Sequence, residues 1–423
     1  MFNYKEILYI QYSLLGKERF KAHNLFVCCV RFAIRMIGYL IRSPFSYKSV
    51  NEVLVVIPSS NNKRSTQPIL DAMHHKSYTC VERFYDFLPM GGIYLKSIIK
   101  SQDFWKLYFS ASKEEREMMR SVFDKFASAR ELYDAVGKFY DANPQIRLLI
   151  VSNDHFPIIR TFIKQAQNHG VKTIYSQHAS VSEFFPPLTF DFSFLDGKES
   201  FMKYKSISNI CGDVFLIGSP RFDIITQMKR QESNVIGIAF NEMDDNNKII
   251  SLINILEDNG FKHIVVRPHP RQDKNNPDWS IFTTHGCEIS HALQENPFKF
   301  ISRLSFLIAG ASSIHLDAAL LRTPSAIFNL QLYDGDLDYY GYARTGLTPI
   351  VKTAYDLVQL IKAPYLPKTE IIRYYDAAYG TEYDGKSASL AARFIDAYLD
   401  GNEQVVLNAL FEKKKEGYYA IKN

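Results

Sequence analysis

The chain has 423 residues, of which 46% are hydrophobic and 22% are charged, with 20 glycines and 17 prolines. This composition excludes a disordered, collagen-like or low-complexity chain, and the length suits two globular domains of roughly 200 residues each. The formal net charge of +5 is a mild excess, which argues against a dedicated nucleic-acid-binding protein because such proteins carry a concentrated basic stripe.

The first predicted element is a basic amphipathic segment over residues 1–50. Its most apolar run, 25–41, is too short and, with Arg31 and Arg35, too charged to span a bilayer. On a helix this run has one apolar face, formed by Phe26, Val30, Ile34, Ile37 and Ile41. Basic residues surround that face: Lys17, Arg19, Lys21, Arg31, Arg35, Arg42 and Lys48. Such a helix either lies on an anionic membrane surface or packs on its own domain, and the sequence leaves both interpretations open.

Strands and helices alternate after this segment. A first series has strands expected at 52–58, 147–152, 171–176, 190–195 and 214–218, with a polar loop at 59–65 and helices at 113–140 and 155–169. A second series has strands expected at 235–240, 263–267, 304–309 and 325–329, with helices at 245–259 and 313–322. This alternation predicts an α/β fold with two parallel sheets that carry helices on both faces.

The restart of the series near residue 234 divides the prediction into domains. We expect a Rossmann-like N-terminal domain over 51–217 and a Rossmann-like C-terminal domain over 218–385. C-terminal helices follow over 386–423, and the first of them, at 387–399, packs back across the molecule.

Polar residues follow the strands of the first domain at the edge where open α/β sheets bind ligands. Asn153, Asp154 and His155 follow one strand, and Gln177 and His178 follow the next. Because an aspartate beside a histidine orients it and raises its basicity, His178 and Asp154 are candidate catalytic bases. Asn153, His155 and Gln177 are candidate acceptor or cleft residues. A purely structural role for the histidines is the competing interpretation.

In the second domain the sharpest motif is Arg267-Pro268-His269-Pro270-Arg271. The prolines restrict the backbone around His269, and an imidazole between two guanidinium groups suits a phosphate. A rigid loop with an exposed histidine is the alternative.

A second anion site is predicted at Gly310-Ala311-Ser312-Ser313, where a strand runs into a helix. The helix start offers backbone N–H groups, and Ser312 and Ser313 add hydroxyl donors. Ordinary helix capping would explain one of these serines equally well.

Taken together, these motifs resemble the GT-B-type transferases of bacterial surface polysaccharides. That group includes polysialyltransferases, capsule Kdo transferases and the CDP-glycerol glycerophosphotransferases of teichoic acid synthesis. The resemblance covers about residues 145–335 and rests on four motifs in order: Gln177-His178, Gly218-Ser219-Pro220-Arg221-Phe222-Asp223, Arg267-Pro268-His269-Pro270, and Ser312-Ser313 with Asp317.

The resemblance implies a GT-B fold of two Rossmann-like domains facing a cleft. It places the phosphate of a cytidine-nucleotide donor at His269, Ser312 and Ser313, and it places His178 near the acceptor. Where the glycerophosphotransferases have HGTPLK, this chain has His178-Ala179-Ser180-Val181-Ser182-Glu183, which favours transfer of a sugar over transfer of a polyol phosphate. Asp196-Gly197 partly matches the paired acids followed by glycine of the polysialyltransferases. This partial match makes Asp196 a third catalytic candidate.

The predicted function is an inverting glycosyltransferase that moves a CMP-activated acidic sugar, sialic-acid-like or Kdo-like, onto a bacterial capsule, lipopolysaccharide or related surface glycan. His178 or Asp154 would take the proton of the acceptor hydroxyl, and positive groups at the phosphate would stabilise the departing CMP. No cofactor or metal is expected, because no cluster of acidic ligands is evident. The alternatives are a CDP-polyol phosphotransferase, a UDP-sugar enzyme of the same fold and a non-catalytic scaffold.

The expected partners are a nucleotide-activated sugar, a glycan or glycolipid acceptor and an anionic membrane surface, without nucleic acid. The five cysteines form no CxxC pair, which argues for a reducing compartment and against a disulfide framework or zinc site. Residues 1–11 lack the basic-then-apolar pattern of a signal peptide. The expected location is cytoplasmic, with peripheral attachment to the inner face of the bacterial inner membrane as the second interpretation.

Overall fold

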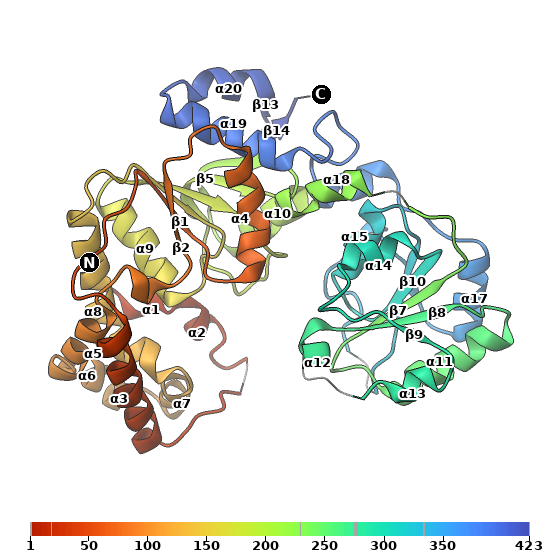
Figure 1. Cartoon of the computed structure of the whole chain (residues 1–423), viewed down its shortest axis with the longest axis horizontal. Coiled ribbons are helices and arrows are strands. Elements are labelled where there is room, and N and C mark those ends of the chain that lie inside the picture. The colour runs from red at the N-terminus through yellow and green to blue at the C-terminus, as the bar shows by residue number, and fades with distance from the viewer. Residues whose placement is uncertain (1, 18, 229, 275–277, 333–334, 423) are drawn as a thin grey trace. The chain divides into compact units, whose positions relative to one another are not determined.

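The computed structural model of the chain describes residues 2–17, 19–228, 230–274, 278–332 and 335–422 (Figure 1). They form two compact units. Unit 1 combines Met1–Arg221 with Ser387–Asn423, and unit 2 is Phe222–Lys386. The C-terminal residues therefore belong to unit 1. Both units are built on largely parallel sheets, and the α/β fold class predicted from the sequence is confirmed.

Unit 1 contains an eight-stranded sheet in the order β13-β14-β6-β5-β4-β3-β1-β2. Its neighbouring strands are parallel except β13 and β14, which form an antiparallel hairpin. The strands are β1 (Val53–Val56), β2 (Tyr78–Val81), β3 (Leu148–Val151), β4 (Lys172–Ser176), β5 (Thr189–Leu195), β6 (Cys211–Leu216), β13 (Phe411–Lys413) and β14 (Tyr419–Ile421). The central strands β1 and β3 are uniformly apolar and buried, as expected for parallel strands covered on both faces.

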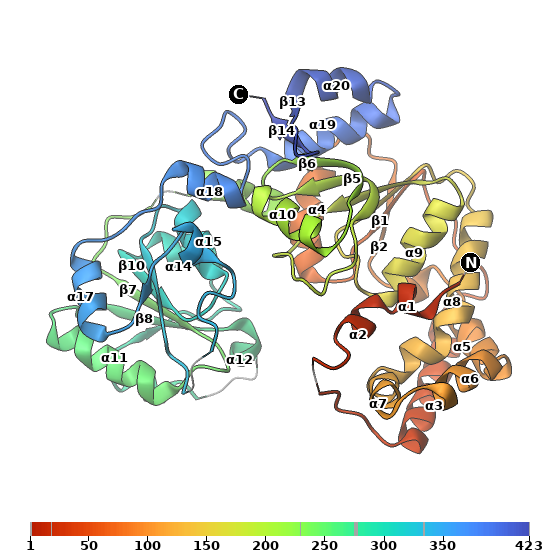
Figure 2. The same cartoon turned by 180° about the vertical axis from the view of Figure 1, so that it is seen from behind.

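Helices surround this sheet, and Figures 1 and 2 show them from opposite sides. Helix α8 packs on α9, and α4 packs on α19. The helices of unit 1 are α1 (Tyr4–Ile7), α2 (Tyr9–Ser13), α3 (Leu25–Arg42), α4 (Ser60–Ala72), η1 (Phe84–Asp86), α5 (Met90–Ile99), α6 (Gln102–Ser110), α7 (Lys113–Ser121), α8 (Phe123–Asp141), α9 (Pro157–Asn168), α10 (Lys198–Ile207), α19 (Ser387–Leu399) and α20 (Glu403–Leu410).

The return of the chain to unit 1 is fixed by one carboxylate. Asp396 of α19 accepts hydrogen bonds from the backbone N–H groups of His74 and His75, at 2.7 and 3.0 Å. These N–H groups follow the end of α4, so α19 closes that helix end as well as packing along it. The helix predicted at 387–399 has these same bounds.

Unit 2 contains a six-stranded parallel sheet in the order β12-β11-β10-β7-β8-β9. Its strands are β7 (Ile236–Phe240), β8 (Ile264–Pro268), β9 (Glu288–Ile289), β10 (Phe306–Ala309), β11 (Ser325–Phe328) and β12 (Ile350–Val351). Its helices are α11 (Asn246–Asp258), α12 (Pro270–Lys274), α13 (Ser280–Thr283), α14 (Pro297–Ser302), α15 (Ile314–Leu320), α16 (Tyr342–Thr345), α17 (Ala354–Lys362) and α18 (Thr369–Tyr375). The 3₁₀ segment η2 (Pro220–Gln227) joins the two units.

Alternation along the strands of unit 2 divides its core in two. Ile238 and Ile308 belong to one buried cluster, whereas Ala239 and Leu307 belong to the other. Because successive strand residues point to opposite faces, these clusters lie on the two sides of the sheet. A sheet with a hydrophobic core on each face is the Rossmann-like arrangement predicted for this part of the chain.

Three predicted elements differ from the structure. The C-terminal helices expected over 386–423 end at Leu410, and the antiparallel hairpin of β13 and β14 follows them. The expected polar loop at 59–65 is the start of α4, because the Ser59 hydroxyl accepts the Asn62 N–H at 3.3 Å and caps a helix of polar residues. The expected helix over 113–140 is divided at Val122, whose backbone leaves the helical region, into α7 and α8. Within the described residues, no helix combines the length and apolarity needed to cross a membrane.

Candidate acid–base site

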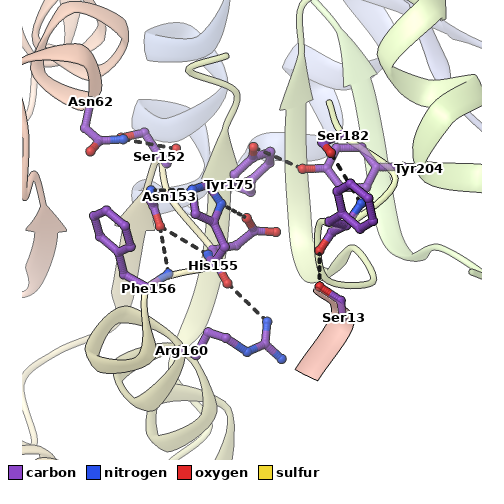
Figure 3. Close-up of polar contacts among 12 residues, drawn as sticks. Ser13, Asn62, Ser152, Asn153, His155, Phe156, Arg160, Tyr175, Ser182 and Tyr204 are labelled. Carbon is purple, nitrogen blue, oxygen red and sulfur yellow. Dashed lines mark hydrogen bonds and ion pairs between the residues drawn. The ribbon is translucent and has the colours of Figure 1, made fainter. Parts of the chain in front are cut away.

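The candidate site of unit 1 is built where β3 and β4 end. Val151 is paired with Tyr175 in parallel register, so the residues that follow emerge at one edge of the sheet. Figure 3 shows Ser152, Asn153 and His155 gathered at the end of β3. The strand-end rule used on the sequence thus brings Asn153, Asp154 and His155 to the same edge as Gln177 and His178.

Asn153 organises the turn between β3 and α9. Its side-chain oxygen accepts the backbone N–H groups of His155 and Phe156 at 3.1 and 3.0 Å (Figure 3). Its amide nitrogen lies 3.0 Å from His155 Nε2. Because an amide nitrogen only donates, Nε2 is the acceptor in this contact and the Nδ1 of His155 carries the proton. Asn153 therefore sets the tautomer of His155.

Asp154 faces that protonated nitrogen. Its Oδ1 lies 3.3 Å from His155 Nδ1, and its side chain is 1% exposed. Its other oxygen, Oδ2, is buried and has no hydrogen-bond partner in the described part of the chain. A buried carboxylate oxygen without a partner costs free energy, so its presence at a strand end calls for a functional explanation.

His178 lies opposite His155, with the ring centroids 5.7 Å apart. Burial, reinforced by the neighbouring His155, lowers the pKa of His178 from 6.5 to about 4. Its ring is hydrogen-bonded to the Ser152 carbonyl, while Nδ1 is buried with no partner among the described residues. At neutral pH the ring is uncharged, and Nδ1 presents a lone pair to any group that enters.

Unpartnered polar atoms concentrate at this edge. Four buried atoms without a hydrogen-bond partner in the described residues belong to the ends of β3 and β4: Ser152 Oγ, Asp154 Oδ2, Ser176 Oγ and His178 Nδ1. Buried polar groups in folded proteins are almost always paired. A hydroxyl pair, a carboxylate and an imidazole left open side by side are a site that a polar ligand would satisfy.

Asp196 follows β5 at the same edge and is buried. Burial raises its pKa from 3.8 to about 6, and Arg221 acts in the opposite direction with its guanidinium 3.6 Å from the carboxylate. Burial wins because the Arg221 contact is long. Asp196 therefore changes its charge near neutral pH, as a proton-transfer group does.

Gln177 is committed to holding the strand ends together. Its side-chain oxygen accepts the Asp196 N–H at 2.9 Å, and its amide donates to the Ala179 carbonyl and the Ser200 hydroxyl at 2.9 and 2.8 Å. All of its hydrogen-bonding groups are used within unit 1. The structure thus gives Gln177 the position of a support for Asp196 and His178.

The N-terminal helices brace this site, which the sequence did not suggest. The half-buried Arg160 donates to the Asp154 carbonyl at 3.1 Å and to the Glu6 carbonyl at 2.5 Å. Phe185 stacks near His155 with the ring centroids 4.7 Å apart, and the Ser13 hydroxyl donates to the Phe184 carbonyl at 3.2 Å. Figure 3 shows Ser13 and Arg160 on this side of the site.

In unit 2 Arg267, which the sequence predicts to bind phosphate, is buried. Its guanidinium already has hydrogen-bond partners within the unit. Its guanidinium donates to the Ser290 hydroxyl at 2.7 Å and to the Glu295 carbonyl at 2.9 Å, and it lies over the Phe300 ring. These contacts hold the loop after β9 and the start of α14 against β8. Arg267 is placed as a structural residue.

His269 and Arg271 lie beyond the carboxyl end of β8 and are exposed. The backbone N–H of His269 donates to the Phe240 carbonyl at 2.8 Å, which fixes the turn. His269 Nδ1 accepts the Arg271 N–H at 3.2 Å, and the Arg271 guanidinium pairs with Glu242 at 2.8 Å. The imidazole is thus held with Nε2 as the atom left to meet a ligand.

Ser312 and Ser313 lie at the start of α15, after β10. The Ser312 hydroxyl accepts the Ile314 N–H at 3.4 Å, whereas Ser313 occupies the N-cap position without a capping hydrogen bond from its side chain. The buried His315 ties this start in place, because its two ring nitrogens contact the Ser325 hydroxyl and the Gly310 carbonyl, each at 3.1 Å. Burial lowers the pKa of His315 to about 4, so this link is neutral.

Sequence reasoning missed Asp244 in unit 2. It follows β7, forms a turn in which its carboxylate accepts the Asn241 N–H at 2.8 Å, and leaves Oδ1 buried without a partner among the described residues. Burial raises the pKa of Asp244. An atom added as a Cβ at Gly310 would lie 3.4 Å from this oxygen, so the turns after β7 and β10 are close neighbours. The strand-end rule would have found it had it been applied to β7.

No protein-family model matches the chain, and no curated protein matches it. Solved structures do. A UDP-GlcNAc 2-epimerase from Neisseria meningitidis, bound to UDP-GlcNAc, superposes with a TM-score of 0.51 at 14% identity, over 84% of this chain and 100% of that one. A second UDP-N-acetylglucosamine 2-epimerase gives a TM-score of 0.50 at 10% identity, over 89% of this chain and 100% of its own. The glycotransferase of kitacinnamycin gives 0.46 at 9% identity, over 85% and 98%.

At these identities the likeness shows the fold, which is GT-B with two Rossmann-like units. The predicted GT-B fold is therefore confirmed. The polysialyltransferase, Kdo transferase and glycerophosphotransferase families are finer assignments that the comparison does not reach.

The prediction of a CMP-activated acidic sugar, transferred to a surface glycan, is wrong. The two epimerase structures named above, with TM-scores of 0.50 and 0.51, are of enzymes that act on a UDP-sugar. The physical reason for the error lies in the motifs. His269 and the serines at the start of α15 suit a phosphate, which every nucleotide sugar carries. None of these residues distinguishes one nucleobase from another.

Proposed function

We propose that this protein is an enzyme that acts on a UDP-sugar, with Asp154 as its base, Asp196 as its acid and His178 as a residue that holds the substrate. The observation that carries this proposal is the concentration of open polar atoms at the ends of β3 and β4. The GT-B fold, which the chain has in common with the UDP-GlcNAc 2-epimerases, supports the choice of nucleotide. That the enzyme needs no metal or other cofactor stays a prediction.

Each residue has a separate task in this proposal. Asp154 Oδ2 accepts a proton from the reacting sugar or hydroxyl, and Oδ1 keeps its contact with His155. His178 is neutral at pH 7 and holds a substrate hydroxyl through Nδ1. Asp196, with a pKa of about 6, donates a proton of its own to the sugar, and exchange with solvent then removes the proton from Asp154 and restores the one on Asp196. Asn153 is a positioning residue, because it sets the tautomer of His155.

In unit 2 the diphosphate is held by a smaller set of residues than the sequence suggested. His269 keeps Nε2 available and Ser313 keeps its hydroxyl uncommitted to capping, so these two are the principal ligands, with Ser312 beside them. Arg267 is left out of this set because its donors are engaged by Ser290 and Glu295.

The nucleotide is tested by calorimetry on the full chain with UDP, CDP and CMP. We expect UDP to bind at least about tenfold more tightly than CMP, which corresponds to about 1.4 kcal/mol. Equal binding of all three, or binding of CMP alone, would reject the proposal.

The reaction is tested by following UDP-GlcNAc by NMR in D₂O with and without a glycan acceptor. Epimerised, transferred and hydrolysed products give different sugar signals, and deuterium in the product reports a proton taken from carbon. Asp154→Asn is expected to lower the rate of the reaction by about 10² to 10⁴ while UDP binding persists. Asp213→Asn on β6, where the side chain is 41% exposed, is the matched control and is expected to keep full activity.

A further inference from the structure

Helix α3 leaves an apolar surface uncovered. Seven large apolar side chains on and just after this helix are exposed, Leu40 the least at 39% and three of them strongly: Phe26 at 77%, Ile41 at 79% and Phe45 at 95%. The spacing of four, four, three and four residues from Phe26 to Ile41 places five of them along one stripe of the helix. We refer to six of these residues as the α3 surface: Phe26, Val30, Ile34, Ile37, Ile41 and Phe45.

The opposite face of α3 anchors the helix to unit 1. Cys28 and Phe32 are buried, and the Phe32 ring stacks on Tyr94 of α5 with the centroids 4.8 Å apart. Leu40 meets Gly91 so closely that an atom added as a Cβ at Gly91 would lie 2.6 Å from the Leu40 Cα. The helix thus has a fixed orientation, and its stripe stays outside the core that holds it. This answers the question that the sequence left open, since one face packs on the unit and the other remains free.

The neighbouring helix α5 extends the exposed apolar area. Ile98 lies one turn beyond Tyr94 and two turns beyond Gly91, on the side of α5 that meets α3, and it is 45% exposed. Ile99 is 70% exposed. Apolar side chains exposed in this number along one helix are rare on soluble proteins unless they meet a partner.

The charged residues of the segment that carries the α3 surface have one sign. The sequence from Arg19 to Asn51 contains no Asp or Glu. Its basic side chains are exposed: Arg19, Lys21, Arg31, Arg35, Arg42 and Lys48. Arg35 pairs with Asp124, and the other five make no ion pair with the described residues.

We propose that the α3 surface binds the headgroup–acyl boundary of an anionic lipid bilayer. Apolar side chains along a helix enter the acyl region, and flanking lysine and arginine side chains reach anionic phosphates. A second copy of the chain is a poorer occupant, because an isologous contact would bring two basic rims together. The proposal stands independently of the UDP-sugar activity.

The test is co-sedimentation of the full chain with vesicles of phosphatidylcholine and phosphatidylglycerol in a ratio of about three to one, and with pure phosphatidylcholine. We expect binding to the anionic vesicles, weakened by salt, and little binding to the neutral ones. Ile34→Glu combined with Ile41→Glu is expected to lower the partition coefficient at least tenfold, from about two buried isoleucines lost. Lys21→Gln with Arg42→Gln is expected to lower it about tenfold through charge alone.

Val405→Glu on α20 is the matched control, because Val405 is 70% exposed and lies away from α3 in the sequence and in the fold. It should bind vesicles like the unchanged chain. Because all substituted side chains are exposed, melting temperatures and UDP binding should not change. Failure of the unchanged chain to sediment with anionic vesicles, or equal binding by the double isoleucine variant, would overturn the proposal. So would a dimer in sedimentation velocity that the same variant dissociates.

Discussion

The imidazole rings of His155 and His178 lie with their centroids 5.7 Å apart, at the ends of adjacent strands. A positive charge on His155 would disfavour a positive charge on His178, which adds to the effect of burial in lowering the pKa of His178 to about 4. His155 has the Asp154 carboxylate beside it, at 3.3 Å. The ring of His178 is therefore uncharged near neutral pH, and its Nδ1 has no partner among the described residues.

The first prediction concerns acid stability. The pKa of His178 is lowered from 6.5 to about 4, so the unfolded chain binds this proton more tightly than the folded chain does. Stability from this residue is present above pH 6.5 and is lost as the pH falls toward 4. Between about pH 7 and pH 5 the loss is about 2 kcal/mol. Denaturant unfolding of His178→Gln should show a smaller loss than the unchanged chain over this interval.

The control for this measurement is His263→Gln, because His263 is an exposed histidine of unit 2. It should leave the pH dependence of the unfolding free energy unchanged. An identical pH dependence in His178→Gln and the unchanged chain would mean that His178 is not held neutral by the fold.

The second prediction is that Asp196 changes the pH dependence of the unfolding free energy in the opposite direction. Its pKa is raised from 3.8 to about 6, so the folded chain binds this proton more tightly, and the resulting stability is present below pH 3.8 and lost as the pH rises through 6. Between about pH 5 and pH 7 the loss is about 1 kcal/mol. In Asp196→Asn the unfolding free energy should therefore rise more steeply with pH than in the unchanged chain. A shallower rise would contradict the assignment.

The two slopes oppose each other over one pH interval, which has a consequence for the site. At about pH 6 the ends of β4 and β5 carry a neutral imidazole and a half-ionised carboxyl group. Groups whose environments move their pKa values toward and away from neutrality in this way are common at sites of proton transfer. The two contributions partly cancel in the unchanged chain, and the single variants show each of them separately.

The third prediction separates stability from activity at Asp154. Asp154→Asn keeps an oxygen for the contact with His155 and removes a buried charge whose Oδ2 has no partner in the described residues. We expect the melting temperature to stay the same or rise, because the uncompensated carboxylate is gone. Turnover of the UDP-sugar should fall by about 10² to 10⁴, the usual contribution of a general base. A lower melting temperature with retained turnover would make Asp154 a structural residue.

The sequence pattern was sufficient for the scaffold and for half of the site. Uniformly apolar runs such as Leu148–Val151 and Ile236–Phe240 predict buried parallel strands, and the residues that follow such strands meet at one edge whatever their identity. That rule predicts from the sequence alone that Asp154, His155 and His178 lie together. It depends only on strand order, which short connections and handedness restrict strongly.

What the pattern could not give depends on contacts distant in sequence. Arg267 resembles a phosphate ligand until its partners Ser290 and Glu295 are seen, and these lie 23 and 28 residues away. The hairpin of β13 and β14 is too short to show a period, and it is a pair of strands because β6 offers an edge to β14. The choice of nucleotide failed for a related reason, since a phosphate motif carries no information about the base.

The last prediction contrasts two residues that the sequence grouped as phosphate ligands. Arg267→Ala should destabilise unit 2 by about 3 kcal/mol or more, because the variant leaves the buried Ser290 hydroxyl and the Glu295 carbonyl without their donor and opens space beside the Phe300 ring. Ser313→Ala should change the unfolding free energy by less than about 0.5 kcal/mol, because its hydroxyl caps no backbone group. UDP binding should respond in the reverse order, with Ser313→Ala weakening it severalfold when measured by calorimetry and Arg267→Lys, which retains a buried cation, leaving it nearly unchanged in the fraction that folds. If Arg267→Lys folded normally and lost UDP binding, the Arg267 guanidinium would be a ligand of UDP. Its contacts with Ser290 and Glu295 would then not be its main role.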